Sequence, residues 1–160
     1  MLVPAILYKD QIVKGFQKLL YTEDMFYETG CVGNWIPEIA DCPEDYQFQY
    51  AIVDSRKENK LIGYLGYTLD WYTSKAYNFG LISFDKGNFI LSRDLFEKLE
   101  ELMLSCHKIE WRMVGGNPVE NAYDNFVKKH NGNKHILKDS IRDHQGNWRD
   151  DVIYEIMGVK

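Results

Sequence analysis

The sequence lacks several features that would assign the chain to a particular compartment. None of its apolar runs approaches the ~20 residues that cross a bilayer, and residues 1–25 contain no apolar segment typical of a secretory signal peptide. Only three cysteines are present, and no two of them form a CxxC pair: Cys31, Cys42 and Cys106. The odd number and the spacing favour free thiols in a reducing compartment. We therefore expect a cytoplasmic protein.

Positive charge and metal-binding patterns are also scarce. The chain has 19 basic and 24 acidic residues, so its formal net charge is −5. A surface of this balance has no overall field that attracts nucleic acid or an anionic membrane, although a local basic pocket remains open. The four histidines do not cluster with the cysteines at the spacing of a zinc site. We therefore expect no nucleic-acid partner, no membrane partner and no metal.

Hydrophobic and aromatic residues are abundant. They make up 45% and 14% of the 160 residues, far more buriable surface than a disordered chain carries. The length fits one domain with a substantial core. Because no internal repeat, linker or low-complexity segment interrupts the chain, we predict a single domain that spans residues 1–160.

The first part of the chain is predicted to begin with a strand and continue into helix. Residues 3–8 form a short apolar run, and Asp10 is typical of a helix N-cap. The residues that follow have the spacing of one helical stripe: Ile12, Val13, Phe16, Leu19 and Leu20. Residues 22–28 are predicted as a second short helix. Gly33, Pro37 and Pro43 favour a mostly irregular loop over residues 31–45, in which Trp35 and Ile36 are expected to be buried or to line a pocket.

The middle of the chain changes to the period of β-structure. Residues 47–54, 61–71 and 76–84 are predicted as strands joined by short turns, which makes an antiparallel meander. In residues 61–71 both faces are fairly apolar, which is typical of a central strand that is covered on both sides.

The second half alternates helix and strand. Residues 89–105 show a leucine stripe, and residues 109–113 alternate as a strand before Gly115. A further helix is predicted with Asn117 as N-cap and Pro118 at its first position. Residues 134–143 and 148–157 close the chain as a hairpin. The predicted order is β-α-α-β-β-β-α-β-α-β-β.

This order resembles that of the GNAT-type N-acetyltransferase superfamily over essentially the whole chain. Residues 61–65 are similar to the family's third strand, residues 117–126 to its helix after the fifth strand, and residues 146–157 to its last two strands. The resemblance implies an α+β fold with a GNAT-like, mixed and mostly antiparallel central sheet and helices on both faces. It also implies that the fourth and fifth strands splay apart and admit the pantetheine arm of acetyl-CoA.

The segment expected to bind the cofactor phosphates departs from the family pattern. The family usually has Gln or Arg, two residues, and then Gly-x-Gly or Gly-x-Ala before a helix, so that backbone amides converge on the pyrophosphate. Here the two small positions fall at Ile90 and Ser92. The resemblance assigns pantetheine contacts to the strand backbone and phosphate contacts to the loop and helix start: Leu81, Ile82, Ser83, Gly87, Asn88, Ser92 and Arg93. The alternative for Gly87 and Asn88 is an ordinary strand-to-helix turn, and for Ser92 an ordinary N-cap.

The catalytic resemblance is weaker. Where the family has a tyrosine that protonates the departing CoA thiolate, this chain has Phe126, and Tyr123 lies about one turn earlier on the same face. We therefore take Tyr123 as the candidate general acid and count Phe126 and Asn117 with the cofactor-binding residues. The alternatives are a core tyrosine for Tyr123 and simple capping for Asn117. Asp70 and Glu110 are placed to serve as a general base, but we assign none, since an unprotonated amine is already a good nucleophile.

The resemblance implies transfer of an acetyl group from acetyl-CoA to a primary amine on a small molecule or peptide. The acceptor site is expected in the early loops, residues 21–45, and in the final hairpin. A homodimer paired through a sheet edge or the last strands remains open. Two alternatives stand beside this reading. The first is a non-catalytic acyl-CoA-binding or protein-interaction domain of the same fold, and the second is an unrelated α+β interaction module.

Overall fold

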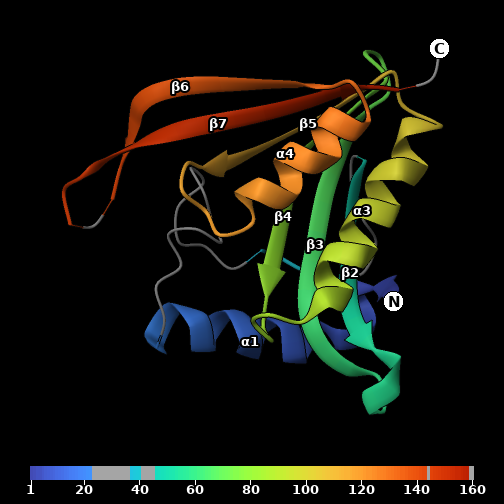
Figure 1. Cartoon of the computed structure of the whole chain (residues 1–160). Helices are drawn as coiled ribbons and strands as arrows, with labels where there is room; N and C mark the ends of the chain where they lie inside the picture. The colour runs from blue at the N-terminus through green and yellow to red at the C-terminus, as the bar shows by residue number, and fades with distance from the viewer. Residues whose placement is uncertain (23–36, 41–45, 144, 159–160) are drawn as a thin grey trace.

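The computed structural model describes residues 1–22, 37–40, 46–143 and 145–158. Two short 3-10 helices, η1 (Ala5–Tyr8) and η3 (Ser55–Lys57), accompany the strands and α-helices. In chain order these are β1 (Leu2–Pro4), α1 (Lys9–Thr22), β2 (Gln47–Asp54), β3 (Lys60–Asp70), β4 (Lys75–Ser83), α3 (Phe89–Met103), β5 (Lys108–Val114), α4 (Glu120–Lys129), β6 (Asn133–Arg142) and β7 (Trp148–Met157) (Figure 1).

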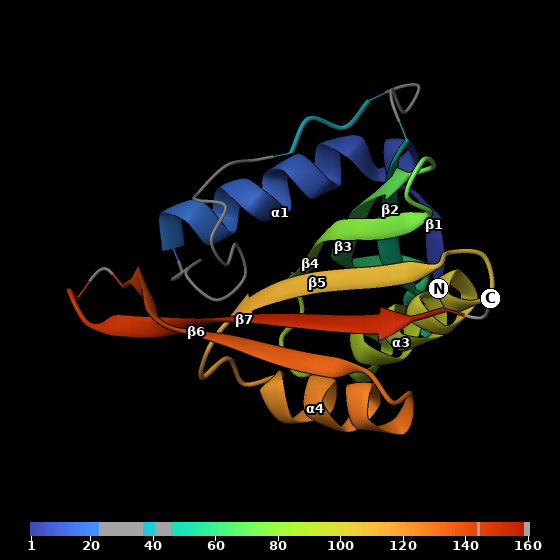
Figure 2. The ribbon, with the colours of Figure 1, turned by 90° about the horizontal axis from the view of Figure 1, so that it is seen from above.

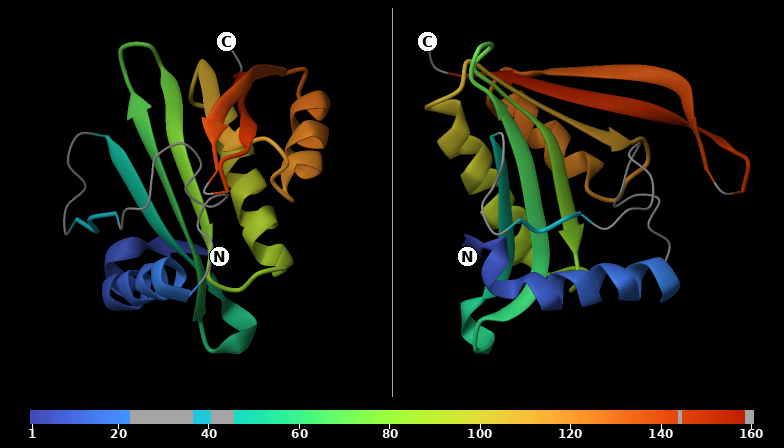
Figure 3. Two further views of the ribbon diagram at one scale, coloured as in Figure 1. Left: turned by 90° about the vertical axis from the view of Figure 1, so that its left-hand side faces the viewer. Right: turned by 180° about the vertical axis from the view of Figure 1, so that it is seen from behind.

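The described strands form one sheet in the order β1-β2-β3-β4-β5-β7-β6. Within this described sheet every pair of neighbours is antiparallel except β4 and β5, which are parallel. The predicted α+β fold with a mixed, mostly antiparallel sheet is therefore confirmed. Figure 3 shows that β6 and β7 form a long hairpin that extends beyond the other strands.

Helices cover both faces of the sheet. Helix α1 lies on one face, and α3 and α4 lie on the opposite face (Figure 2). The predicted stripe of α1 packs Ile12, Phe16 and Leu19 into a core with residues of β2, β3 and β4. On the other face, the leucines of α3 pack against β3, β5 and β7. Strand β3 is buried over most of its length because it lies under helices on both sides, as its two apolar faces predicted.

The structure corrects the prediction for the start of the chain. Only Leu2–Pro4 pairs as a strand, and residues 5–8 form one turn of 3-10 helix that leads directly into α1. Asp10 is therefore not an N-cap but a residue of the first turn of α1, where its negative charge suits the helix dipole. The apolar run of residues 3–8 did not separate strand from helix because such short runs fit both. The second predicted helix, residues 22–28, lies almost entirely outside the described residues, as do Trp35 and Ile36.

The start of α4 is also corrected. Asn117 and Pro118 precede the helix, which begins at Glu120 with Val119 as its N-cap residue. Asn117 still caps, because its Oδ1 accepts a hydrogen bond from the Val119 amide (3.1 Å). The Glu120 carboxylate accepts one from the Gly116 amide (2.8 Å). The polar pattern therefore indicated the helix correctly. Its Asn117 side chain, however, caps the turn that precedes the helix.

Among the described residues, no helix is long and apolar enough to cross a membrane. In the same part of the chain, no group of three or more His, Cys, Asp or Glu residues is arranged to hold a metal ion.

Charged side chains connect β4, β5 and β7 at the end of the sheet where β4 and β5 begin. Lys75 of β4 contacts Glu110 of β5 (2.9 Å), and Lys108 of β5 contacts Glu155 of β7 (2.5 Å). Asn133 donates a further hydrogen bond to Glu155 (3.0 Å). The hydrogen bond from Lys108, and then that from Asn133, lower the pKa of Glu155 to about 2.

We expect Glu155→Gln to lower the free energy of unfolding by about 1 kcal/mol near pH 7, because the side chain is partly exposed and solvent screens part of the interaction. A carboxyl whose folded pKa is depressed stabilises the fold above its unfolded pKa of about 4.3, and that contribution fades as pH falls toward the folded pKa. The difference between variant and wild type should therefore shrink between about pH 5 and pH 2. Urea denaturation at several pH values, with the exposed Glu38→Gln as control, measures it. A pH-independent difference would contradict the expectation.

Candidate functional site

The parallel strands β4 and β5 pair only at their beginnings. The pairs are Lys75 with Lys108 and Ala76 with Ile109, and beyond them the two strands diverge (Figure 1). Past Ala76, β4 is paired with β3 on its other side, and past Ile109, β5 is paired with β7. Within the described residues, no strand pairs with the two edges that face each other across this gap. The gap therefore offers two rows of backbone hydrogen-bonding groups to a ligand.

A β-bulge in β4 accounts for the divergence. The register of β3 with β4 shifts between Gly66–Gly80 and Thr68–Tyr77, so that two residues of β4 oppose Tyr67 alone. One of the two is Asn78, whose φ of 56° lies in the left-handed region that asparagine tolerates. A bulge bends its strand and increases its twist. This one follows directly after the last pair with β5 and so turns β4 away from it.

The hydrogen-bonding pattern shows which peptide groups of β4 face the gap. The Phe84 amide donates to the Ile62 carbonyl (2.8 Å). Since bonded and non-bonded pairs alternate in an antiparallel ladder, Ile82 exchanges its hydrogen bonds with Tyr64 of β3. The peptide groups of Leu81 and Ser83 therefore point into the gap. Of the three predicted backbone contacts, Leu81 and Ser83 have suitable geometry, whereas Ile82 faces β3 and has its side chain buried on the α1 side.

The predicted turn at Gly87 and Asn88 lies between the end of β4 and the start of α3. Gly87 has a φ of 81°, which favours glycine, and Asn88 is the N-cap of α3. The Asn88 side chain accepts a hydrogen bond from the Ile90 amide and donates one to Asp85, both at 3.2 Å. Ser92 is not the cap, contrary to the alternative considered for it, because α3 already begins at Phe89. Helix α3 thus starts at the open end of the gap, with Ser92 in its first turn.

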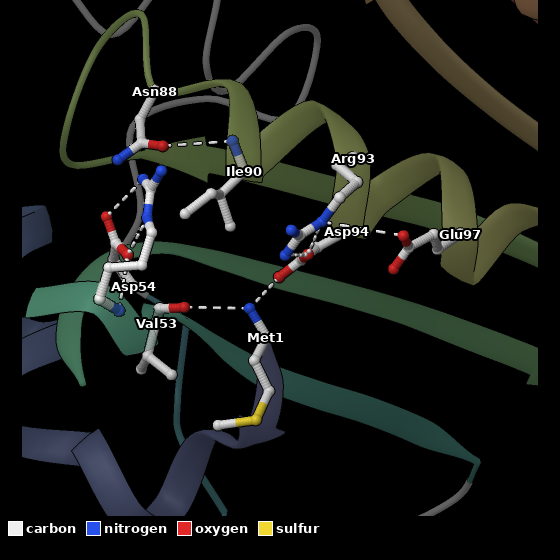
Figure 4. Close-up of polar contacts among 9 residues, drawn as sticks. Met1, Val53, Asp54, Asn88, Ile90, Arg93, Asp94 and Glu97 are labelled. Atoms are coloured by element: carbon white, nitrogen blue, oxygen red, sulfur yellow. Dashed lines mark hydrogen bonds and ion pairs between the residues drawn. The ribbon is translucent and has the colours of Figure 1, made fainter. Parts of the chain in front are cut away.

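The predicted charge of Arg93 is held by carboxylates of its own helix (Figure 4). Its guanidinium donates to Asp94 Oδ1 at 2.7 and 3.0 Å and lies 3.7 Å from Glu97. The hydrogen bond to Asp94 raises the pKa of Arg93. Asp94 is buried and also forms an ion pair with the amino group of Met1. Both residues are therefore engaged beside β1, and the Asp94 carboxylate lies away from the start of α3.

A second basic group lies near the start of α3 and was not predicted from the sequence. The guanidinium of Arg56, in η3, is bonded to Asp54 at 3.0 Å and lies 5.1 Å from the centre of the Phe89 ring. Asp54 raises the pKa of Arg56 through the same hydrogen bonds. No local pattern signals this placement, because it joins a turn between β2 and β3 to a helix more than 30 residues later.

Tyr123 and Phe126 lie in an aromatic cluster between α3, α4 and β5. Tyr123 is 8% exposed, and its ring centre is 5.6 Å from that of Trp111 and 5.7 Å from that of Tyr154. Burial raises the pKa of the Tyr123 hydroxyl. Phe126 stacks on Phe96 at 4.7 Å. The structure thus brings Tyr123 over β5, next to the gap, and packs Phe126 between the two helices.

The two carboxylates considered as general bases are engaged elsewhere. Asp70 accepts hydrogen bonds from the amides of Tyr72 and Thr73 and from the Thr73 hydroxyl, and this last bond contributes most to its lowered pKa. Glu110 belongs to the ion pairs at the closed end of the gap. The structure therefore adds no support for either as a base.

Two buried polar atoms beside the gap have no hydrogen-bond partner in the described part of the chain. They are Ser83 Oγ on β4 and Trp111 Nε1 on β5. Ile109 and Met113, two residues to either side of Trp111, are buried in the core under α3 and α4. Leu81, two residues before Ser83, packs on that core as well. Alternate strand residues share a face. Both unpaired atoms therefore lie on the α3 and α4 side of the sheet, one on each side of the gap.

Solved structures of acetyltransferases share this fold. No protein-family model and no curated protein sequence matches the chain. Among solved structures, a putative acetyltransferase from Acinetobacter baylyi is similar over 98% of this chain and 90% of its own, with a TM-score of 0.67 and 13% identity. A chimera of the Vibrio cholerae spermidine N-acetyltransferase SpeG and hSSAT covers 71% of both chains, with a TM-score of 0.56 and 16% identity.

A probable acetyltransferase of the GNAT family from Chromobacterium violaceum has a TM-score of 0.54 and 16% identity. It is similar over 72% of this chain and 60% of its own. The chain therefore has the GNAT-type acetyltransferase fold, as the resemblance in sequence implied.

Proposed function

We propose that the protein is an acetyl-CoA-dependent N-acetyltransferase that acts on a primary amine. The observation that supports this most is the gap between β4 and β5, where two unpaired strand edges face each other directly beside the start of α3. An extended ligand with amide groups is complementary to such edges, and the pantetheine arm of acetyl-CoA has two amides. The structural neighbours are acetyltransferases by their descriptions, which agrees with this chemistry.

In this proposal the cofactor lies along β4 with its phosphates at α3. The peptide groups of Leu81 and Ser83 bind the pantetheine arm, and the Gly87–Asn88 turn offers backbone amides to the pyrophosphate, which the helix dipole also attracts. Ser92 keeps its proposed place at the edge of the phosphate site. Arg93, held by Asp94 and Glu97 beside β1, is no longer assigned a phosphate contact. Asn117 keeps its proposed contact with the pantetheine arm at the open end of the gap. Phe126 keeps its proposed place among the cofactor-binding residues, in the neighbouring aromatic cluster.

The proposed reaction needs no covalent enzyme intermediate. The unprotonated amine attacks the thioester carbon, a carbon–nitrogen bond forms, and the carbon–sulfur bond breaks with its electron pair leaving on the CoA sulfur. Tyr123 donates a proton to that thiolate, and solvent takes the proton that the amine nitrogen loses. The Tyr123 hydroxyl has no hydrogen bond to another described residue, which leaves its proton available for this step.

Replacing Ser83 by proline tests the backbone contact. Proline has no N–H, and at this position the missing N–H faces the gap rather than β3, so we expect the fold to be kept. Acetyl-CoA affinity should fall about tenfold, as expected for one lost hydrogen bond worth about 1.4 kcal/mol. Ser83→Ala is the matched control, since it removes the hydroxyl and keeps the N–H. Equal affinity of the two variants in calorimetric titration would rule out a contact with this N–H.

One assay of the free CoA thiol tests both whether the protein turns over and which amine it acetylates. Purified protein is incubated with acetyl-CoA and a panel of primary amines that includes spermidine, because one structural neighbour is described as a spermidine N-acetyltransferase. We expect amine-dependent thiol release and an acetylated product in mass spectra. Acetyl-CoA binding without release for any amine would instead favour the non-catalytic acyl-CoA-binding function. That alternative is supported by Asn88, which already occupies one amide of α3.

We also propose that the protein is cytoplasmic and that two copies of it pair through β6. Within the described sheet β6 is an edge strand bonded to β7 alone, and it exposes Ile136 and Leu137. An exposed apolar edge is a template for pairing with another strand. Light scattering on a size-exclusion column should give the mass of a dimer, and a monomer mass at high protein concentration would refute this pairing.

A further inference from the structure

The indole N–H of Trp111 is buried without a partner. The Trp111 side chain is 4% exposed, and its Nε1 makes no hydrogen bond to any described residue. Leaving such a donor unpaired costs about 1–3 kcal/mol, and native proteins leave few of them. A tryptophan that only fills a core does not need this donor, because phenylalanine fills a core without it. The N–H therefore points to a ligand.

Trp111 is placed where such a ligand would end. It lies two residues beyond Ile109, the last residue of β5 that pairs with β4, and so at the vertex of the gap. Its ring stacks on Tyr154 of β7 at 5.4 Å and meets the Tyr123 ring edge-on at 5.6 Å. Tyr154 is itself fixed, because its hydroxyl donates to Asp124 Oδ1 (2.6 Å). The neighbouring rings thus hold the indole in one orientation beside the candidate general acid.

The surroundings of Trp111 also indicate which kind of atom accepts the hydrogen bond from its N–H. An indole N–H only donates, so the ligand must supply an acceptor atom. Every ring contact of Trp111 in the described structure is with Tyr123, Phe126 or Tyr154. Such an aromatic environment favours a neutral acceptor over a phosphate, whose desolvation is costly. Carbonyl oxygen is the neutral acceptor that an acyl-pantetheine arm provides.

We infer that Trp111 Nε1–H donates a hydrogen bond to a carbonyl oxygen of the acyl-pantetheine arm, a role that rests on the proposed function. The second orphan atom agrees with this path, because Ser83 Oγ lies on the same face of the sheet, nearer to the start of α3. An arm that enters past Ser83 and ends at Trp111 follows the gap from its open end to its vertex. The hydrogen-bond acceptor is either the thioester carbonyl or one of the two amide carbonyls of the arm.

Trp111→Phe tests the inference, because it removes the donor and keeps most of the ring. We expect the ligand-free variant to fold, because the loss of the unpaired donor offsets part of the cost of the smaller ring. Its affinity for acetyl-CoA should fall about tenfold in calorimetric titration. If the acceptor is the thioester carbonyl, affinity for CoA is unchanged, and if it is an amide carbonyl, affinity for CoA falls equally. Trp148→Phe, on an exposed tryptophan of β7, is the matched control.

A second measurement does not depend on the variant's folding. The indole N–H resonance of Trp111 is assigned in ¹⁵N spectra by elimination, from phenylalanine variants of Trp35, Trp71 and Trp148. It should move downfield when acetyl-CoA is added, as expected for a donor that gains an acceptor. Wild-type binding with no such shift, or with equal affinity of Trp111→Phe, would overturn the inference and leave the proposed function standing. No binding of acetyl-CoA to the wild type would overturn both.

Discussion

Gly63→Ala is expected to destabilise the protein by about 1–3 kcal/mol and to weaken acetyl-CoA binding. Gly63 lies on β3 opposite Ser83 of β4. A Cβ atom there would overlap Leu91 of α3 and would lie 2.7 Å from the Ile82 carbonyl oxygen. Because the second contact is with backbone, a side-chain rotation alone cannot relieve it. The end of β4 must therefore shift relative to β3, and the Leu91 side chain of α3 must turn away. The end of β4 leads directly to the proposed phosphate site.

Gly80→Ala is the matched control for this prediction. Gly80 lies on β4, and a Cβ atom there would meet no atom within 4 Å. We expect its free energy of unfolding to stay within about 0.5 kcal/mol of wild type. Urea denaturation of the three proteins measures the difference. Equal stability of Gly63→Ala and Gly80→Ala would show that the Ile82 carbonyl and Leu91 do not lie against Gly63 as described.

Tyr123→Phe is expected to lower the turnover number by about a hundredfold or more, as is typical when a general acid is removed. Acetyl-CoA affinity should be kept, because the ring that packs on Trp111 and Tyr154 remains. Tyr72→Phe, on a fully exposed tyrosine in the turn between β3 and β4, is the control. Full turnover in Tyr123→Phe would leave Tyr123 as a core residue, the alternative that its burial also permits.

The pH dependence of turnover is an independent test of Tyr123 as the general acid. A tyrosine acts as an acid only while protonated, and its ordinary pKa is about 10. Since burial raises the pKa of Tyr123, the alkaline loss of turnover should begin above that value in the wild type. The same alkaline limb should be absent from the residual turnover of Tyr123→Phe.

The elements of the fold were largely predictable because their patterns are local. The alternation in residues 47–54 and 148–157 gave both strands with the bounds that the structure has. The leucine stripe of α3 was similarly sufficient. Boundaries failed where two local structures suit the same residues, as at Asp10, and where a capping residue precedes a turn rather than the helix, as at Asn117.

The candidate site was predictable only in part, for a physical reason. The resemblance to GNAT-type proteins indicated Leu81, Ser83 and the Gly87–Asn88 turn, which the structure places along the gap and at the start of α3. It gave no sign of Arg56 beside Phe89 or of the unpaired Trp111 nitrogen. Both depend on contacts between distant segments, and no periodicity in a single sequence encodes such contacts. The alternation in residues 109–113 marked Trp111 as buried, which is all that a local pattern shows.

The central claim is that the gap between β4 and β5 binds acetyl-CoA, and calorimetric titration of the purified protein tests it most directly. Acetyl-CoA should bind with saturation and micromolar affinity, and Ser83→Pro should bind it more weakly than Ser83→Ala. Desulfo-CoA, which keeps the arm and the phosphates, should bind, whereas ADP, which lacks the arm, should bind far more weakly. No saturable binding of acetyl-CoA up to millimolar concentration would contradict the account.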